Sequence, residues 1–152
     1  MQIIENFLPE SIHKEYFEHY YSREPVWRFS RKANSNAAET GNAYFNNETY
    51  VDTWKEKDGT PSKPPWEVFK LLEYLPNGYS KIIRAKTNLF IRQDNTVKYG
   101  MHLDYPSFDK KFKILLYYIN TNNGGTEFGT GDFIKSVANR AVIVDGDIEH
   151  QT

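Results

Sequence analysis

Residues 112–145 read FKILLYYINTNNGGTEFGTGDFIKSVANRAVIVD and indicate the fold class most clearly. Short stretches of β-branched and aromatic residues alternate there with clusters of Asn, Gly and Asp, a pattern typical of short strands joined by turns. The same pattern extends from Thr87 to the C-terminal end. The sequence predicts strands at 87–93, 97–104, 112–119, 125–128, 132–136 and 140–145, with a last piece at 148–150.

The N-terminal half adds helices to these strands. A short strand is predicted at 2–7, and a helix begins around Pro9 and carries apolar side chains on one face. A second helix is predicted from Trp66 to Leu75, whereas residues 30–65, rich in Asn, Lys, Gly and Pro, suggest a long loop region. We therefore expect one α+β, mainly β domain spanning 1–152, either an antiparallel barrel or a double-sheet jelly roll with a helical buttress.

Composition and charge limit the classes of partner and of metal site that this chain can have. The chain has 152 residues and a net charge of -1, with no cysteine. This balance indicates neither nucleic acid nor a membrane surface as a partner. Without thiols, a metal must be held by His, Asp and Glu. No secretion signal and no apolar run of about 18 residues is present, so we expect a soluble cytoplasmic protein.

The four histidines are the main candidates for chemistry. His13 and His19 lie about 120° apart on the predicted first helix, too divergent for one metal, and are expected to be surface residues. In a predicted strand, His102 and Asp104 share one face, although this spacing alone is a weak signal. In a jelly roll the strand that carries His150 can lie beside them. Two imidazoles and one carboxylate would form the facial triad of non-heme Fe(II) oxygenases.

Several ordered motifs resemble those of one family, the Fe(II)- and 2-oxoglutarate-dependent dioxygenases of the prolyl 4-hydroxylase-like branch. Residues 99–104 (YGMHLD) resemble the family's Tyr-x-x-His-x-Asp, 116–120 (LYYIN) its Tyr-Tyr-Leu-Asn strand, and 124–128 (GGTEF) its Gly-Gly-x-Thr-x-Phe turn. Residues 139–144 (NRAVIV) are similar to the strand before the distal histidine. The opening at 4–9 (IENFLP) also matches, and the resemblance covers essentially the whole chain.

The resemblance implies that His102, Asp104 and His150 hold Fe(II) and form the catalytic centre of a double-stranded β-helix. It implies that 2-oxoglutarate and dioxygen are co-substrates, converted to succinate and CO2 while a substrate is hydroxylated; ascorbate is allowed as a further cofactor. Tyr118 falls where relatives bind the distal carboxylate of 2-oxoglutarate, or is a core aromatic. Arg92 stands where relatives place a cosubstrate-binding tyrosine, and Thr126 can line the same pocket; a solvated arginine and a turn threonine are the alternatives.

One departure concerns the cosubstrate anchor. Relatives carry an Arg or Lys nine or ten residues after the distal histidine, on the closing strand, whereas this chain ends two residues after His150. We therefore expect the domain to lack its final C-terminal strand, and the anchor to lie beyond Thr152. The small single-domain form resembles members encoded by bacteriophages, which would place it in the host cytoplasm.

The sequence leaves the substrate, the class of protein and the oligomeric state open. The substrate is a prolyl or other protein side chain, an amino acid, another small molecule or a nucleobase. A cupin-like metalloenzyme that does not use 2-oxoglutarate is an alternative, although cupins normally bring further metal-binding histidines. A non-catalytic β-sandwich binding module, with His102 and His150 as structural residues, is the alternative from another class. The oligomeric state is not indicated.

Overall fold

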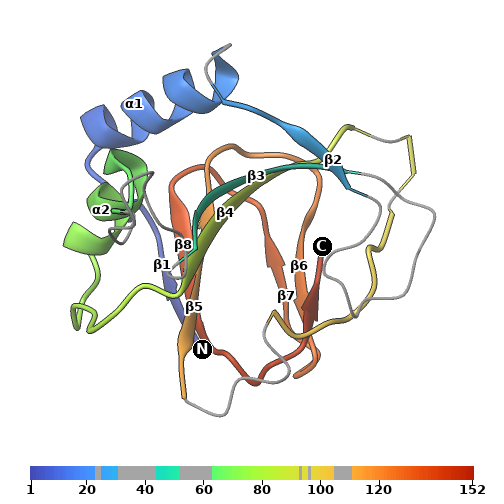
Figure 1. Cartoon of the computed structure of the whole chain (residues 1–152). Helices are drawn as coiled ribbons and strands as arrows, with labels where there is room; N and C mark the ends of the chain where they lie inside the picture. Colours follow the sequence, from blue (N-terminus) through green and yellow to red (C-terminus); the bar gives the residue numbers. More distant parts are fainter. Residues whose placement is uncertain (23–24, 31–43, 52–62, 93, 96, 105–110) are drawn as a thin grey trace.

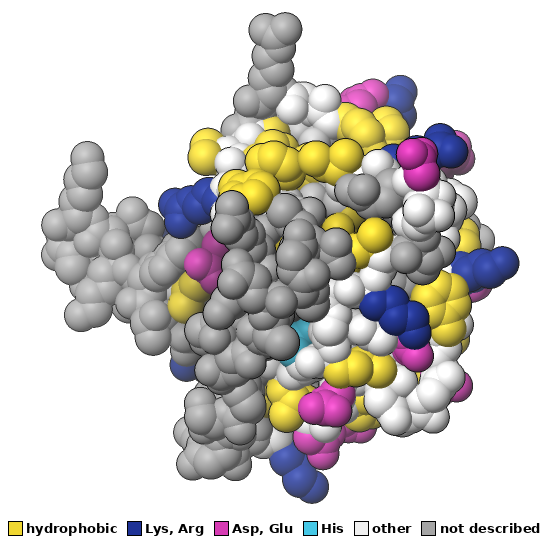
Figure 2. Space-filling view, turned by 90° about the vertical axis from the view of Figure 1, so that its right-hand side faces the viewer, with side chains coloured by type: hydrophobic (Ala, Val, Ile, Leu, Met, Phe, Trp, Pro, Cys, Tyr) yellow, Lys and Arg dark blue, Asp and Glu magenta, His cyan; other side chains and the backbone are white. Residues whose placement is uncertain are grey.

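The computed structural model describes residues 1–22, 25–30, 44–51, 63–92, 94–95, 97–104 and 111–152. The described part is mainly β and contains small antiparallel sheets with two helices (Figure 1). Neither of these helices is long and apolar enough to span a membrane. On the face shown in Figure 2, the described acidic and basic side chains are interspersed rather than gathered by sign.

Three sheets of three strands form the β part, and every strand pair in them is antiparallel. The first is β1 (Gln2–Ile4), β8 (Arg140–Asp145) and β5 (Lys113–Tyr118), with β8 in the centre. The second is β2 (Arg28–Ser30), β3 (Tyr44–Val51) and β4 (Arg84–Leu89), with β3 in the centre. The third is β7 (Phe133–Lys135), β6 (Gly125–Phe128) and β9 (His150–Gln151), with β6 in the centre.

Alternation along β5 separates two hydrophobic clusters. Leu115 and Tyr117 pack on the cluster that includes the helix residue Tyr16. Ile114, Leu116 and Tyr118 belong to the second cluster, which includes Phe128 of β6. Successive side chains of a strand point to opposite faces, so one face of this sheet meets the helices and the other faces the third sheet.

Two helices cover the outer face of the first sheet. They are α1 (Glu10–Tyr21) and α2 (Trp66–Glu73), which lie together on one side of the molecule (Figure 1). Tyr16 is the buried residue of α1, and its ring makes edge contacts with Trp66 and Tyr117. The helices therefore buttress the sheet, as the sequence predicts.

Several predicted boundaries need correction. The predicted loop region 30–65 contains the eight-residue strand β3, and its parts at 31–43 and 52–62 lie outside the described residues. Strand β3 includes Asn and Glu residues of low strand propensity, but it pairs with strands on both edges, so tertiary pairing outweighs local preference. The predicted strand 97–104 is wrong as well, because the chain turns at Gly100 with φ 85° and forms only a bridge at His102.

Strand β2 was not predicted and β1 is shorter than the predicted 2–7, whereas the other elements agree closely with the prediction. The first helix runs over 10–21, and the second ends at Glu73 rather than Leu75. Strand β4 begins and ends a few residues earlier than predicted. The predicted piece at 148–150 is β9, displaced toward the C-terminal end. A cavity of about 2330 Å³ is lined by residues of all three sheets and of both helices, and it is well above the roughly 300–1,000 Å³ of a single ligand pocket.

Candidate metal centre

Backbone pairing places His102 opposite His150. Strand β9 pairs with β6, with His150 opposite Phe128. His102 then bridges to His150 on the other side, and each backbone N–H donates to the other residue's carbonyl at 3.0 Å. Directly opposed residues of an antiparallel pair project their side chains to the same side. The two imidazole ring centroids accordingly lie 4.8 Å apart.

Local hydrogen bonds orient both rings. The Nδ1 atom of His102 lies 3.0 Å from the carbonyl oxygen of Gly100, and Nδ1 of His150 lies 3.4 Å from that of Ile148. Because a carbonyl oxygen only accepts, Nδ1 carries the proton in each neutral ring and Nε2 keeps its lone pair. A donated Nδ1–H is the usual support of a histidine that binds metal through Nε2.

Asp104 completes the group. Its Oδ1 lies 4.0 Å from Nε2 of His102, and its Oδ2 lies 3.9 Å from Nε2 of His150. One ligand atom from each of the three residues lies within 4.8 Å of the others. Ligands at right angles around a metal, each at about 2.1 Å, would be about 3.0 Å apart. The donor set fits a divalent ion, and binding requires the ligand atoms to approach one another by about 1–2 Å.

The candidate centre is largely shielded from solvent. The side-chain exposure is 10% for His102, 16% for Asp104 and 7% for His150. Burial by itself would raise the pKa of Asp104, but the nearby positive groups, Lys86 first, hold it below its usual value. Burial lowers the pKa of His150, although Asp104 opposes the shift. Near neutral pH the carboxylate is therefore charged, and His150 is neutral and free to bind a metal.

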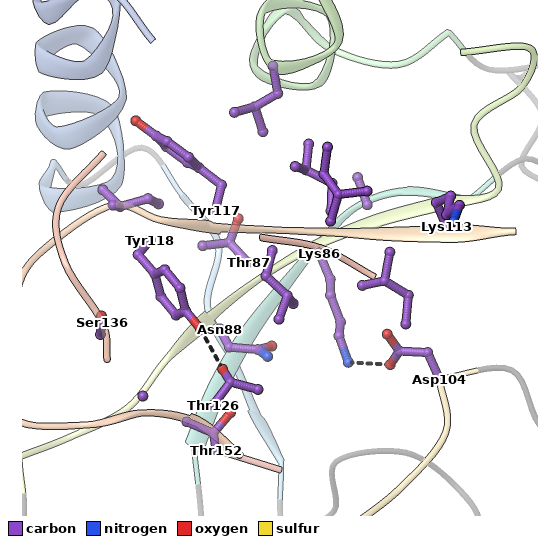
Figure 3. A pocket seen from close by; sticks show the side chains of 18 of the residues that line it. Lys86, Thr87, Asn88, Asp104, Lys113, Tyr117, Tyr118, Thr126, Ser136 and Thr152 are labelled. Atoms are coloured by element: carbon purple, nitrogen blue, oxygen red, sulfur yellow. Dashed lines mark hydrogen bonds and ion pairs between the residues drawn. The ribbon is translucent and has the colours of Figure 1, made fainter. Parts of the chain in front are cut away.

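Lys86 of β4 is a member of the site that sequence reasoning missed. Its Nζ lies 3.5 Å from Oδ1 of Asp104, and its side chain is 17% exposed (Figure 3). The available signal was the alternation of β4, which places Lys86 and Asn88 on one face. From sequence alone, a single lysine in a predicted strand is nevertheless expected to be solvated, because lysines are rarely buried. Its burial here depends on how the sheets pack together.

The three predicted cosubstrate residues have different locations. Tyr118 faces the interior cluster, and its hydroxyl donates to Oγ1 of Thr126 at 2.9 Å (Figure 3). Thr126 is buried in β6. Burial raises the pKa of Tyr118, with the bond to Thr126 opposing, so its hydroxyl stays protonated at neutral pH. Arg92 is exposed beyond the end of β4; it lines the large cavity, but no hydrogen bond or ion pair joins it to Tyr118, Thr126 or the triad within the described chain.

The other two histidines lie on α1, where they make contacts with core residues. Nδ1 of His13 lies 2.6 Å from the hydroxyl of Tyr117, and Nε2 of His19 lies 3.4 Å from Glu67. Both are partly buried rather than free on the surface, which corrects the expectation from sequence. Neither belongs to the His102, Asp104 and His150 group.

Comparison of the chain with protein-family models, with curated proteins and with solved structures finds no match.

Proposed function

We propose that the protein is an Fe(II)- and 2-oxoglutarate-dependent dioxygenase of the prolyl 4-hydroxylase-like branch, built on a double-stranded β-helix. The observation that carries this proposal is the convergence of His102, Asp104 and His150, with both Nε2 lone pairs near one carboxylate. Two neutral imidazoles and one carboxylate on one side of an ion leave the other positions open, as non-heme oxygenation requires.

The number of histidines supports this function over a cupin-like one. All four histidines of the chain are described, and two of them contact Tyr117 and Glu67 on the helix side. A site with additional histidine ligands is therefore not supported. A binding module without catalysis gives no reason for a buried carboxylate beside two histidines with free Nε2 atoms. An activity that requires a metal would separate the binding module from the dioxygenase and the cupin-like enzyme.

Each residue of the centre has a distinct part in the proposed chemistry. When bound, iron and 2-oxoglutarate supply the oxidation of substrate by dioxygen. His102 and His150 hold the metal with rings fixed by their Nδ1 hydrogen bonds, and Asp104 provides the one negative ligand. Apolar side chains of β5 and β8 line the interior beside Tyr118. The substrate class proposed stays broad: a protein side chain, an amino acid, another small molecule or a nucleobase.

Turnover of 2-oxoglutarate tests the proposal. The protein is supplied with Fe(II), 2-oxoglutarate, ascorbate and air, and succinate is quantified. We expect succinate formation that falls at least about a hundredfold in Asp104→Asn, which removes the charged ligand but keeps the side-chain size. Asp145→Asn is the matched control, because that exposed aspartate pairs with Lys113 at the surface. Absence of succinate from the wild type, or equal amounts from Asp104→Asn, would contradict the proposal.

A further inference from the structure

Lys86 is a buried cation next to a candidate metal ligand, and its position has to be reconciled with metal binding. The 3.5 Å separation between its Nζ and Asp104 is long for a hydrogen-bonded ion pair. A divalent ion between His102, His150 and Asp104 would take over the carboxylate and repel the ammonium. Lys86 would then be a largely buried charge whose other acidic neighbour, Glu48 on β3, is already paired with Arg84 at 2.7 Å. This is costly unless another anion arrives.

The charges of the loaded centre define that anion. A divalent ion, the Asp104 carboxylate and the Lys86 ammonium together leave two positive charges, because the neutral imidazoles add none. A ligand with two carboxylates balances this excess if one carboxylate binds the metal and the other meets Lys86. A ligand with one carboxylate leaves one positive charge buried.

Polar side chains for the second carboxylate come from three strands that line the cavity: the exposed Asn88 of β4, Tyr118 of β5 and Thr126 of β6. Asn88 follows Lys86 by two residues, so both project from the same face of β4, whereas Thr87 between them bonds to Tyr20 on α1. In Figure 3, Asn88 lies on the side of Lys86 away from Asp104, toward the hydroxyls of Tyr118 and Thr126. These residues all line the large cavity. The flexible lysine stem allows the ammonium to turn toward them.

We infer that Lys86 is the cationic anchor for the distal carboxylate of the cosubstrate, with Asn88, Tyr118 and Thr126 as neutral partners. This inference rests on the proposed function and deepens it. It replaces Arg92 as the anchor available within the described chain, because Arg92 is exposed and Lys86 is buried beside Asp104. A basic residue beyond Thr152 is then not required for 2-oxoglutarate binding.

Titration calorimetry of the Mn²⁺-loaded protein tests the inference with two ligands. 2-Oxoglutarate and 2-oxopentanoate share the 2-oxo acid head and chain length, but the second has a methyl group in place of the distal carboxylate. We expect the wild type to prefer 2-oxoglutarate by about tenfold to a hundredfold, as a charge-assisted contact provides. Lys86→Met should reduce this ratio to within about threefold of one, and Lys86→Arg, which restores the charge, should recover part of it.

Two controls separate a binding role from a structural one. Lys113→Met removes the same charge from an exposed lysine that pairs with Asp145, and it should keep the wild-type ratio. Lys86→Met should bind Mn²⁺ at least as tightly as the wild type, because a repulsive charge is removed. A loss of Mn²⁺ binding in Lys86→Met would show that Lys86 organises the metal centre and would overturn the assignment.

The outcomes also distinguish this inference from the proposed function. If the Mn²⁺-loaded wild type binds neither 2-oxo acid, the proposed function fails and the inference fails with it. If the wild type prefers 2-oxoglutarate and Lys86→Met keeps that preference, the assignment of Lys86 alone is wrong. If the wild type binds both acids equally, no cationic anchor acts at the site and the inference is likewise wrong.

Discussion

At the scale of single residues, the candidate centre joins groups whose charges depend on each other. Asp104 is kept ionised in a largely buried place by the nearby positive charge of Lys86, against the effect of burial. His150 is kept neutral mainly by burial. The metal-free protein therefore carries a charged carboxylate and an unprotonated imidazole, the two states that metal binding requires.

The lowered pKa of His150 predicts a pH dependence of stability without metal. Burial lowers the pKa of His150 below its ordinary value of 6.5, and it lowers that of His13 too. The unfolded chain then binds more protons than the folded one, so stability is full above pH 6.5 and is lost as pH falls through the folded pKa values. We expect urea unfolding in EDTA to show a lower free energy of unfolding at pH 5.5 than at pH 7.5, with a smaller decrease in His150→Gln. Stability that rises on acidification would contradict this.

Two neighbouring tyrosines provide a matched pair for the cosubstrate pocket. Tyr118→Phe removes the hydroxyl that donates to Thr126 and should raise the KM for 2-oxoglutarate by about tenfold to 150-fold, since one hydroxyl bond to a charged group contributes about 1.5–3 kcal/mol. Tyr117→Phe makes the same chemical change on the helix side, where the hydroxyl contacts His13 and Asn139. It should leave the KM unchanged. Equal effects of both changes in the succinate assay would remove Tyr118 from the pocket.

The sequence could predict the triad residues but not Lys86. His102, Asp104 and His150 were identified by ordered motifs, which preserve the order of ligands along the chain. The structure brings them together, although not through the regular strand predicted for 97–104. Lys86 has no motif around it, and only the packing of β4 against the other sheets shows that it is buried beside Asp104.

At the scale of elements, short apolar runs bounded by turn residues were the most informative signal. Such runs predicted β5 and β8 with nearly correct bounds, and in the structure their side chains alternate between the helix side and the interior. Strand β3 was missed because its central residues, 46–49, are polar and because it is held by β2 and β4 on its two edges. The strand propensity of the residues in a segment does not predict which strands will pair with it.

Asn139 connects two elements and carries a testable contribution to stability. It has φ 62°, its side chain accepts from the N–H of Leu8 and donates to the carbonyl of Leu8, and Tyr117 also donates to it. Asn139→Ala should lower the free energy of unfolding by about 2–4 kcal/mol, because buried backbone groups lose their partners and alanine disfavours this φ. Asn139→Gly should recover about 1 kcal/mol by relieving the backbone.

The control for this prediction is Asn122→Ala. Asn122 is exposed and its side chain accepts from the N–H of Gly124, so its replacement should cost less than about 1 kcal/mol. Urea denaturation measures all three variants. Similar losses for Asn139→Ala and Asn122→Ala would show that the connection from β8 to the N-terminal segment contributes little.

At the scale of the whole molecule, the candidate centre connects segments far apart in the chain. Asp104 and His150 are separated by 46 positions, and His150 begins the strand that edges the third sheet. Mn²⁺ at a hundred times its Kd should stabilise the fold by about 2.7 kcal/mol, which corresponds to roughly 5–10 °C in Tm for a chain of this size. His150→Gln should show little of this shift. An equal shift in His150→Gln would place the ion elsewhere.

The proposed function depends on His102, Asp104 and His150 forming one metal site. Anomalous diffraction from crystals of the protein soaked in Mn²⁺ locates that ion. We predict one strong anomalous peak bonded to Nε2 of His102, a carboxylate oxygen of Asp104 and Nε2 of His150, each at about 2.0–2.2 Å, with Lys86 turned away from Asp104. A strong peak bonded to other residues would contradict this site. So would the absence of a peak at these three side chains after a soak in saturating Mn²⁺.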